Sequence, residues 1–341
     1  MKVLCLVDFP IKSGDRWLWN YLKNDDQVEF LSTATVDRYA KWGKLLAYYP
    51  AYWQLGLRAM SKVSKTHYDL VVAWEGKNGF PYGFLRNIAR KRTPKFVILT
   101  FIYRGIITHF PKFARFGLEA VNHITVTTQS EYDYYSSALS LPKDKLSVCP
   151  LGWYDVDTSN GNRAERSKDK FILAAGRSYR DYATLARAVE GLDIKVLIIA
   201  RPFNLAGLKL PANVETRDLL PSKDFLDILL QAQFVVAPLQ PVPYSAGEIN
   251  IVQSLSAGKA IIATRIPSSE NYITHESNGL LVSPGNVEEM RQAILRLWQN
   301  PDEVAKMGQV ARLSYEKEFT FEKFSQRIYN ILLKVVNSDE R

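Results

Sequence analysis

Two arginines and a glycine-led helix are the residues of this chain whose types and spacing suit the binding of an anion. Arg177 and Arg180 follow an apolar stretch, residues 171–175, and precede a helix that we predict from residue 182. Two guanidinium groups at the carboxyl end of a strand would neutralise a diphosphate. The alternative is that both arginines are solvated surface residues, as arginine usually is. Asp181, which follows them, would be the N-cap of the next helix.

The second part of this candidate site lies in residues 244–281. Gly247 permits a tight turn, residues 249–257 have helical apolar spacing, Gly258 ends the helix, and residues 261–263 read as a buried strand. The first turn of a helix presents unpaired amides and the positive end of the helix dipole, so we expect a phosphate over residues 247–250. An ordinary loop and helix of an α/β domain is the alternative, because one glycine at such a turn is weak evidence.

The elements that must position these residues form two series of strands separated by helical stretches. The first series is residues 3–7, 28–31, 70–73, 96–100, 124–127 and 147–150, and the second is residues 171–175, 196–200, 234–237 and 261–264. A polar stretch, residues 155–170, reads as the linker between them. This alternation predicts two α/β domains with parallel sheets, facing each other across a cleft, with ligands beyond the carboxyl ends of the strands.

Composition limits the class of protein. The chain has 341 residues, 47% of them hydrophobic, which is enough to bury the cores of two domains. Cys5 and Cys149 suggest no disulfide framework. The first residues lack the features of a signal peptide, and no apolar run approaches the roughly 20 residues that span a bilayer. We therefore expect a cytoplasmic protein, either soluble or bound to the surface of a membrane.

The positive charge is concentrated in the first half. Residues 1–150 contain 21 Lys+Arg against 12 Asp+Glu, whereas the remainder is balanced, so an anionic partner is expected for the first domain. Residues 38–65 mix lysine and arginine with Trp42, Tyr48, Tyr49, Tyr52 and Trp53, and residues 103–116 add Phe110, Lys112, Phe113, Arg115 and Phe116. This mixture suits an anionic membrane surface. Alternatively, the aromatic residues belong to the core and the cations are solvated.

Several motifs, in order, resemble those of the retaining glycosyltransferases of family 4, which have the GT-B fold. The family's phosphate-binding helix, strand and NG-apolar turn resemble residues 253–286, and its diphosphate-contacting motif resembles Gly176, Arg177 and Arg180, with arginine in place of the usual lysine. The family's first domain ends with a strand, a helix that starts at a serine, and a glycine-x-x-aspartate step. Residues 124–135 and 149–155 resemble this ending, with Ser130, Gly152 and Asp155 at the corresponding positions. Residues 319–336 resemble the family's terminal helix, which crosses back to the first domain.

The resemblance implies an acceptor-binding domain over residues 1–154, a nucleotide-sugar-binding domain over 155–318 and a crossover helix over 319–341. The implied catalytic residues are Arg177, Arg180 and Glu248. Gln253 would face the ribose, Asn250 a phosphate, and Gly247 with Glu248 the sugar. The full implied donor site is Gly14, Gly176, Arg177, Arg180, Ser245, Ala246, Gly247, Glu248, Ile249, Asn250 and Gln253.

The chain also departs from the family pattern. Ser245 and Gln253 stand where members usually carry two glutamates, and the amino-terminal glycine pair is reduced to Gly14. No histidine follows the fourth strand, where residues 99–105 read LTFIYRG; His109 lies slightly further on, and a lone histidine is more often structural. These departures bear on the choice of donor sugar and on the acceptor side.

Acceptor residues are expected at strand ends of the first domain. Asp8 follows the first strand, with helix capping near Gly14 as its alternative, and Trp74 and Glu75 follow the third. Glu75 would bind an acceptor hydroxyl or pair with Lys77. The remaining candidates are Tyr103, Arg104 and His109.

The resulting hypothesis is retaining transfer of a sugar from a nucleoside diphosphate sugar, UDP first and GDP or ADP as alternatives, to a hydroxyl that is lipid-linked or part of a glycan. Arginines and a helix terminus would stabilise the leaving diphosphate without a metal, for which we see no ligand cluster, and no cofactor is expected. The alternatives are a non-catalytic sugar-nucleotide-binding or scaffolding protein and, with no motif to support it, a nucleic-acid-binding protein.

Overall fold

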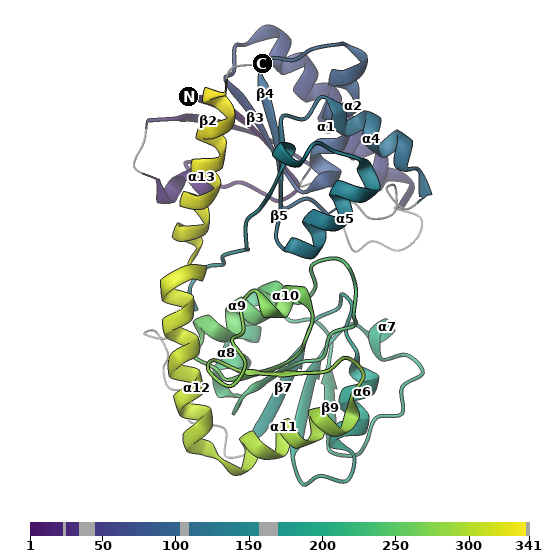
Figure 1. Ribbon diagram of the computed structural model, residues 1–341, viewed down its shortest axis with the longest axis vertical. Helices are drawn as coiled ribbons and strands as arrows, with labels where there is room; N and C mark the ends of the chain where they lie inside the picture. The colour runs from purple at the N-terminus through teal and green to yellow at the C-terminus, as the bar shows by residue number, and fades with distance from the viewer. Residues whose placement is uncertain (23–24, 34–44, 103–108, 157–169, 339–341) are drawn as a thin grey trace. The chain divides into compact units, whose positions relative to one another are not determined.

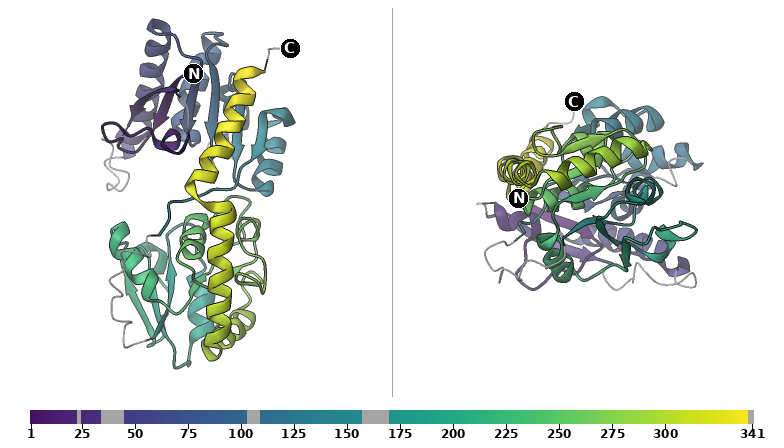
Figure 2. Two further views of the ribbon diagram at one scale, coloured as in Figure 1. Left: turned by 90° about the vertical axis from the view of Figure 1, so that its left-hand side faces the viewer. Right: turned by 90° about the horizontal axis from the view of Figure 1, so that it is seen from below.

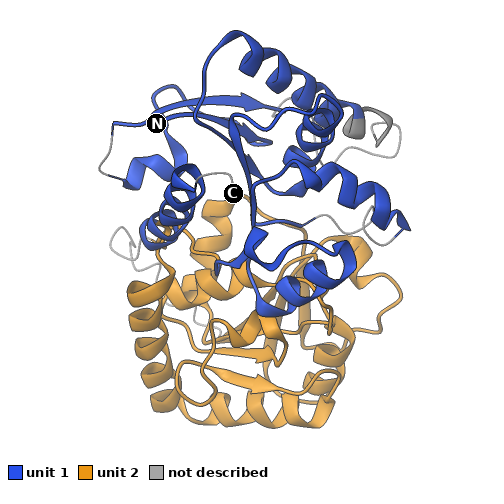
Figure 3. Cartoon of the chain, turned by 45° about the horizontal axis from the view of Figure 1, so that its top comes forward, with its two compact units in different colours: residues 1–150, 322–341 blue, residues 151–321 orange. Residues whose placement is uncertain are grey.

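The computed structural model describes residues 1–22, 25–33, 45–102, 109–156 and 170–338. The chain divides into two compact units, shown in different colours in Figure 3. Unit 1 comprises Met1–Pro150 together with Glu322–Arg341, and unit 2 comprises Leu151–Phe321. Each unit has its own sheet and its own hydrophobic core.

Unit 1 is built on a parallel six-stranded sheet with the order β2-β1-β3-β4-β5-β6. Its central strands are short apolar runs that are buried, as expected for a parallel sheet covered on both faces, whereas the edge strand at residues 27–32 is only partly buried. They are β1 (Lys2–Val7), β2 (Gln27–Ser32), β3 (Leu70–Trp74), β4 (Lys95–Leu99), β5 (His123–Val126) and β6 (Leu146–Val148). All six correspond to strands predicted from the sequence.

Helices α1, α2 and α4 follow one another along one side of unit 1, as Figure 1 shows. The helical segments of this unit are η1 (Trp17–Tyr21), α1 (Leu45–Lys65), α2 (Gly76–Ile88), α4 (Pro111–Glu119), α5 (Gln129–Leu139), η3 (Lys143–Lys145) and α13 (Phe321–Asn337). Nearly all of α13 belongs to unit 1, where Phe324 packs edge-on against Trp74 at 6.3 Å between ring centroids and Arg327 donates to the carbonyl of Pro150 at 3.0 Å.

Unit 2 contains a second parallel six-stranded sheet, with the order β12-β11-β10-β7-β8-β9. Chain order reverses between β7 and β10, which is the switch point where ligands of doubly wound sheets bind. The strands are β7 (Phe171–Ala175), β8 (Lys195–Ile199), β9 (Val214–Arg217), β10 (Val235–Ala237), β11 (Ile261–Thr264) and β12 (Leu280–Val282). Our sequence prediction missed β9 and β12.

Helices cover both faces of this second sheet, as the views in Figures 1 and 2 agree. Their bounds are α6 (Tyr182–Val189), α7 (Pro202–Leu205), α8 (Ser222–Gln231), α9 (Glu248–Ser256), α10 (Pro267–Glu270), α11 (Val287–Gln299), α12 (Pro301–Ser314) and η4 (Tyr315–Phe319). Asp181 caps α6 by accepting from the amide of Thr184, so the capping role considered for Asp181 is confirmed.

Part of the basic and aromatic segment lies outside the described residues, namely 38–44 of residues 38–65 and 103–108 of residues 103–116. Within the described part, Tyr52 is buried and donates to Asp8, which is the core role considered for these aromatic side chains.

Candidate functional site

The loops that follow β7 and β10 are joined at the switch point of unit 2. The amide of Asp181 donates to the carbonyl of Pro238 at 3.0 Å, and the amide of Gln240 donates to the carbonyl of Tyr179 at 2.9 Å. These bonds continue the pairing of the two strands into their loops. Consequently the residues after β7 lie beside the segment that leads to α9.

Arg180 is the central side chain of this site. It is only 8% exposed. Its Nε donates to the carbonyl of Ala175 at 2.9 Å, its Nη1 to the carbonyl of Ser178 at 2.6 Å and its Nη2 to Oδ1 of Asn250 at 2.9 Å. Burial lowers its pKa because desolvation penalises the charged form, although a guanidinium stays protonated at neutral pH.

No carboxylate compensates this buried charge within the part of the chain that the structure describes. All three partners of Arg180 are neutral oxygens. A buried cation is normally paired, because its desolvation costs several kcal/mol and neutral hydrogen bonds offset only part of that cost. The arrangement therefore suits an anionic ligand as the missing counter-charge.

Two glycines make this packing sterically possible. Gly176 has φ 115°, and a Cβ there would lie 2.2 Å from Nη2 of Arg180. Gly247 has φ 82° and caps α9, and a Cβ there would lie 2.8 Å from Cδ2 of Leu239. Any side chain at Gly176 would displace the Arg180 guanidinium, so the glycine and the arginine act together.

The first turn of α9 lies against this guanidinium through the bond from Arg180 to Asn250. Ile249 is exposed and Asn250 is half-buried, and the first amides of a helix have no intrahelical acceptor. The preceding loop is held by Ser268 of α10, whose Oγ accepts from the amide of Ala246 at 3.3 Å and donates to its carbonyl at 3.0 Å. Backbone donors and a buried cation thus converge at one place.

Glu248 is the first residue of α9 and is buried, and its carboxylate is held by a hydrogen bond from Tyr272. Its Oε1 accepts from the hydroxyl of Tyr272 at 3.1 Å, and that hydroxyl accepts from the amide of Leu151 at 2.9 Å. Tyr272 therefore fixes the orientation of this side chain and connects it to the first residue of unit 2. Sequence reasoning did not single out Tyr272, since a tyrosine 24 residues from its partner gives no local indication.

The other predicted donor residues are distributed around this centre. Arg177 is exposed, and its carbonyl accepts from Asn204 of α7 at 2.7 Å. Ser245 and Ala246 are buried in the loop before α9. Gln253 is half-buried one turn into α9, and its side-chain amide has no hydrogen-bond partner among the described residues. Gly14 is in unit 1, between β1 and η1, with φ 80°.

A cluster of charged side chains lies at the carboxyl ends of β1 and β3, the switch point of the first sheet. Nζ of Lys77 lies 3.0 Å from Oδ2 of Asp8 and 2.6 Å from Oε2 of Glu75. The pairing considered for Glu75 is therefore present. Glu75 also has φ 64°, a strained conformation for a residue with a side chain, and such strain is enriched at functional sites.

Aromatic rings border this cluster. Trp74 ends β3 and packs edge-on against Trp17 at 5.2 Å between ring centroids. Asp8 is held by Lys77 and Tyr52, whereas the loop that contains Gly14 uses Asp15, which accepts from the amide of Trp17. Asp8 therefore does not cap the helical segment near Gly14, which was the alternative considered for it.

The remaining acceptor candidates lie elsewhere in the chain. His109 is exposed before α4, and Tyr103 and Arg104 lie outside the described residues.

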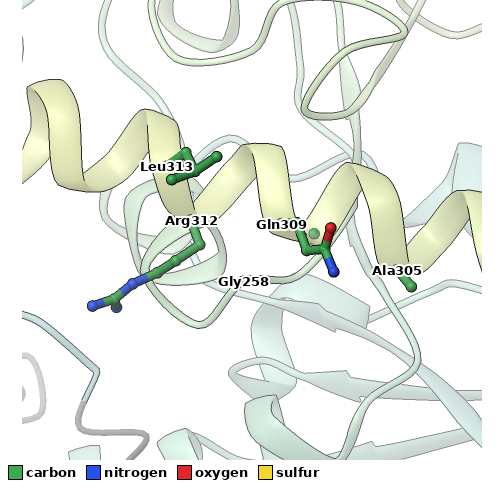
Figure 4. A pocket seen from close by; sticks show the side chains of 6 residues that line it. Gly258, Ala305, Gln309, Arg312 and Leu313 are labelled. Atoms are coloured by element: carbon green, nitrogen blue, oxygen red, sulfur yellow. The ribbon is translucent and has the colours of Figure 1, made fainter.

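A shallow pocket lies at the opposite end of α9. It has a volume of about 480 Å³ and is lined by Gly258, Ala305, Gly308, Gln309, Arg312 and Leu313 (Figure 4). Arg312 there has a structural role, because its Nη2 donates to Oδ2 of Asp155 at 2.8 Å and its Nη1 to the carbonyl of Ser256. Partial burial tends to raise the pKa of Asp155, but hydrogen bonds from Arg312 and Ser256 lower it overall.

Neither a metal-binding cluster nor a membrane-spanning helix is found among the described residues. No group of three or more histidine, cysteine, aspartate or glutamate side chains in the described ranges is placed to hold a metal ion. Of the helices that the structure describes, none combines the length and the apolar character needed to span a bilayer.

Two Rossmann-like units, each with a parallel six-stranded sheet, are the GT-B fold of glycosyltransferases. Residues 171–300 match the family model described as glycosyl transferases group 1. The chain is 27% identical over 239 residues to D-rhamnosyltransferase WbpZ of Pseudomonas aeruginosa, an alignment that covers 65% of this chain and 60% of that protein. The chain thus spans about three fifths of the length of this relative.

Solved structures support the fold over nearly the whole chain. Sucrose-phosphate synthase from Thermosynechococcus elongatus matches with a TM-score of 0.75 at 15% identity, covering 98% of this chain and 99% of that one. HepE from Anabaena in complex with UDP matches with a TM-score of 0.69 at 15% identity, covering 98% and 100%. The GT-B fold predicted from the sequence is therefore confirmed.

Proposed function

We propose that this protein is a glycosyltransferase that moves a sugar from a nucleoside diphosphate sugar to a hydroxyl of a glycan or of a lipid-linked acceptor. The observation that carries the proposal is Arg180, a buried guanidinium without a carboxylate partner among the described residues, bonded to the first turn of α9. A diphosphate supplies the charge that this arrangement lacks and the acceptors that helix amides require. The similarity to a rhamnosyltransferase and to a UDP complex supports the same class of donor.

The chemical task of such a site is to stabilise the diphosphate as it leaves the anomeric carbon. Negative charge grows on the leaving oxygen while the sugar takes on oxocarbenium character, so preorganised donors accelerate the step. We propose that Arg180 and the amides of Ile249 and Asn250 do this, that Arg177 assists from the exposed rim, and that no metal ion is needed. We also propose retention of the anomeric configuration, as in the family 4 enzymes that the motifs resemble.

For the acceptor, we propose the cluster of Asp8, Glu75 and Lys77 in unit 1. Paired carboxylates beside a lysine offer acceptors and a donor to a polyhydroxylated molecule, and the half-buried ring of Trp74 suits the apolar face of a sugar. A lipid-linked acceptor would require the protein to work at a membrane surface. We therefore propose a peripheral location on the cytoplasmic face of a membrane.

A panel of UDP-, GDP- and ADP-sugars separates the candidate functions. A donor that binds the folded protein raises its melting temperature. At a donor concentration 100 times the dissociation constant, binding adds about 2.7 kcal/mol to the free energy of unfolding. Donor turnover in the presence of a chelator, followed by NMR of the product's anomeric proton, then tests transfer, metal independence and retention. Binding without turnover for any donor would favour a non-catalytic sugar-nucleotide-binding protein, and no binding would reject the nucleotide-sugar proposal.

A further inference from the structure

Unit 1 carries an aromatic seam, half-buried at Trp53 and Phe84 and exposed at Phe113 and Phe116, that the proposed chemistry does not use. Phe84 of α2 lies 5.4 Å from Trp53 of α1, 4.8 Å from Phe113 and 5.1 Å from Phe116 of α4, between ring centroids. The rings therefore form one continuous row across three helices. We call this row, with the exposed residues around it, the aromatic face.

Close helix packing brings the three helices into one layer. A Cβ on Gly83 of α2 would lie 2.5 Å from the carbonyl oxygen of Gly117 of α4, and a Cβ on Gly56 of α1 would lie 2.9 Å from the amide of Tyr82. Backbones that approach so closely leave no room for side chains between them. The apolar side chains on the outer side of the layer are consequently presented together.

Each helix contributes apolar residues at helical spacing to this outer side. On α1 these are Trp53 and Leu57, on α2 Phe84 and Ile88, and on α4 Phe113 and Phe116, with Phe110 just before α4. Spacings of three and four residues place each pair on one side of its helix. The exposed fractions are 57% for Leu57, 59% for Ile88, 64% for Phe110, 39% for Phe113 and 38% for Phe116.

The charge on the three helices of the seam is mostly positive. Helices α1 and α2 contain no acidic residue, and α4 contains only Glu119 at its end. Exposed Arg58, Lys112 and Arg115 form no ion pair within the described ranges. Exposed apolar rings flanked by uncompensated cations are the composition of a surface that binds an anionic interface.

We propose that the aromatic face docks onto a bilayer that contains anionic lipid. Phe110, Phe113 and Phe116 would enter the interfacial region, while Lys112 and Arg115 contact lipid phosphates. A second copy of this chain is a poor occupant, because a two-fold contact would oppose cations of the same face. Nucleic acid is disfavoured because Leu57 and Ile88 are aliphatic and offer no surface for base stacking.

Flotation with vesicles tests this docking without any measurement of glycosyl transfer. Phosphatidylcholine vesicles with and without about one third phosphatidylglycerol are compared at low and high salt. We expect the protein to float only with the anionic vesicles and to be released by salt. Absence of flotation with anionic vesicles at low salt would overturn the proposal.

Two variant pairs assign the binding to the aromatic face. Lys112→Glu with Arg115→Glu should weaken partitioning by about tenfold or more, whereas the control Lys223→Glu with Lys306→Glu, on exposed positions of unit 2, should have little effect. Phe110→Ser should weaken binding more than Phe203→Ser, an equally exposed phenylalanine of unit 2.

Melting by circular dichroism establishes that each variant is folded. If both test variants bind as tightly as the wild type, the aromatic face is not the docking surface. If the protein binds an oligonucleotide in a salt-sensitive manner but not the vesicles, the face belongs to a nucleic-acid partner and the membrane proposal is wrong.

Discussion

Replacing Arg180 with methionine separates its role in folding from its role in binding. Arg180→Met keeps most of the buried volume but removes three hydrogen bonds from a charged donor, to Ala175, Ser178 and Asn250. At about 1.5 kcal/mol each, their loss would cost roughly 4–5 kcal/mol. Removing a buried charge also relieves a desolvation penalty of several kcal/mol. We therefore expect the free energy of unfolding to change by no more than about 2 kcal/mol.

The same substitution should weaken nucleotide binding markedly. A guanidinium and a phosphate about 4 Å apart attract each other by roughly 4 kcal/mol at an effective dielectric constant of 20. Desolvation of the phosphate offsets part of that attraction, so a net loss of about 2 kcal/mol is expected. This corresponds to roughly thirtyfold weaker binding of UDP. Uridine, which lacks the diphosphate, should bind the variant and the wild type equally.

Isothermal titration of UDP and uridine into wild type, Arg180→Met and Arg187→Met measures this difference. Arg187 is an exposed arginine of α6 and serves as the matched control, expected to leave both affinities unchanged. Equal UDP affinity in wild type and folded Arg180→Met would refute the assignment of Arg180 to the diphosphate. An equal loss for uridine would show that the substitution disturbs the pocket and not the charge.

Three further predictions concern the scaffold. Gly176→Ala places a Cβ against the Arg180 guanidinium at φ 115°, so urea unfolding should show a loss of about 1–3 kcal/mol, and UDP titration should show weaker binding. Asp155→Asn removes a carboxylate whose pKa is lowered in the folded state, so its pairing with Arg312 stabilises the fold above about pH 4 and loses this contribution as pH falls. Because the Asp155 side chain is half exposed, urea unfolding should show the variant less stable than wild type by about 1 kcal/mol or less at pH 7 and by a smaller amount at pH 3; an equal deficit at both pH values would contradict this. Burial lowers the pKa of His123, so as pH falls the unfolded state takes up a proton at a higher pH than the folded state does. The free energy of unfolding of wild type should therefore decrease below about pH 6.5, and that of His123→Gln should decrease less. Equal pH profiles for the two proteins would contradict this.

Most strands were predictable because they are uninterrupted apolar runs. The predicted strand at residues 171–175 is β7 to the residue. β9 escaped prediction because it lies at the edge of its sheet and its residues VETR include no apolar run, and β12 because only three residues pair. A hydrophobic pattern reports burial, and an edge strand has little of it.

The residues of the candidate site could be selected by their types from the sequence, but their arrangement in space could not. Arg180 and Asn250 are 70 positions apart, and their contact depends on β10 lying beside β7. Nothing in the local sequence specifies this strand order. In the same way, the pairing of Glu75 with Lys77 is local and was one of the two alternatives given for Glu75, whereas the approach of Lys77 to Asp8 depends on β1 lying beside β3.

The amide of Ile249 offers the most direct test of the proposed diphosphate site. With the protein labelled with ¹⁵N at isoleucine, Ile249→Val identifies the resonance by its disappearance. Titration with UDP should move this resonance downfield, as expected for an amide that gains a charged acceptor, and uridine should leave it nearly unchanged. If UDP binds while the Ile249 resonance stays in place, the diphosphate does not lie on the first turn of α9, and the account is wrong.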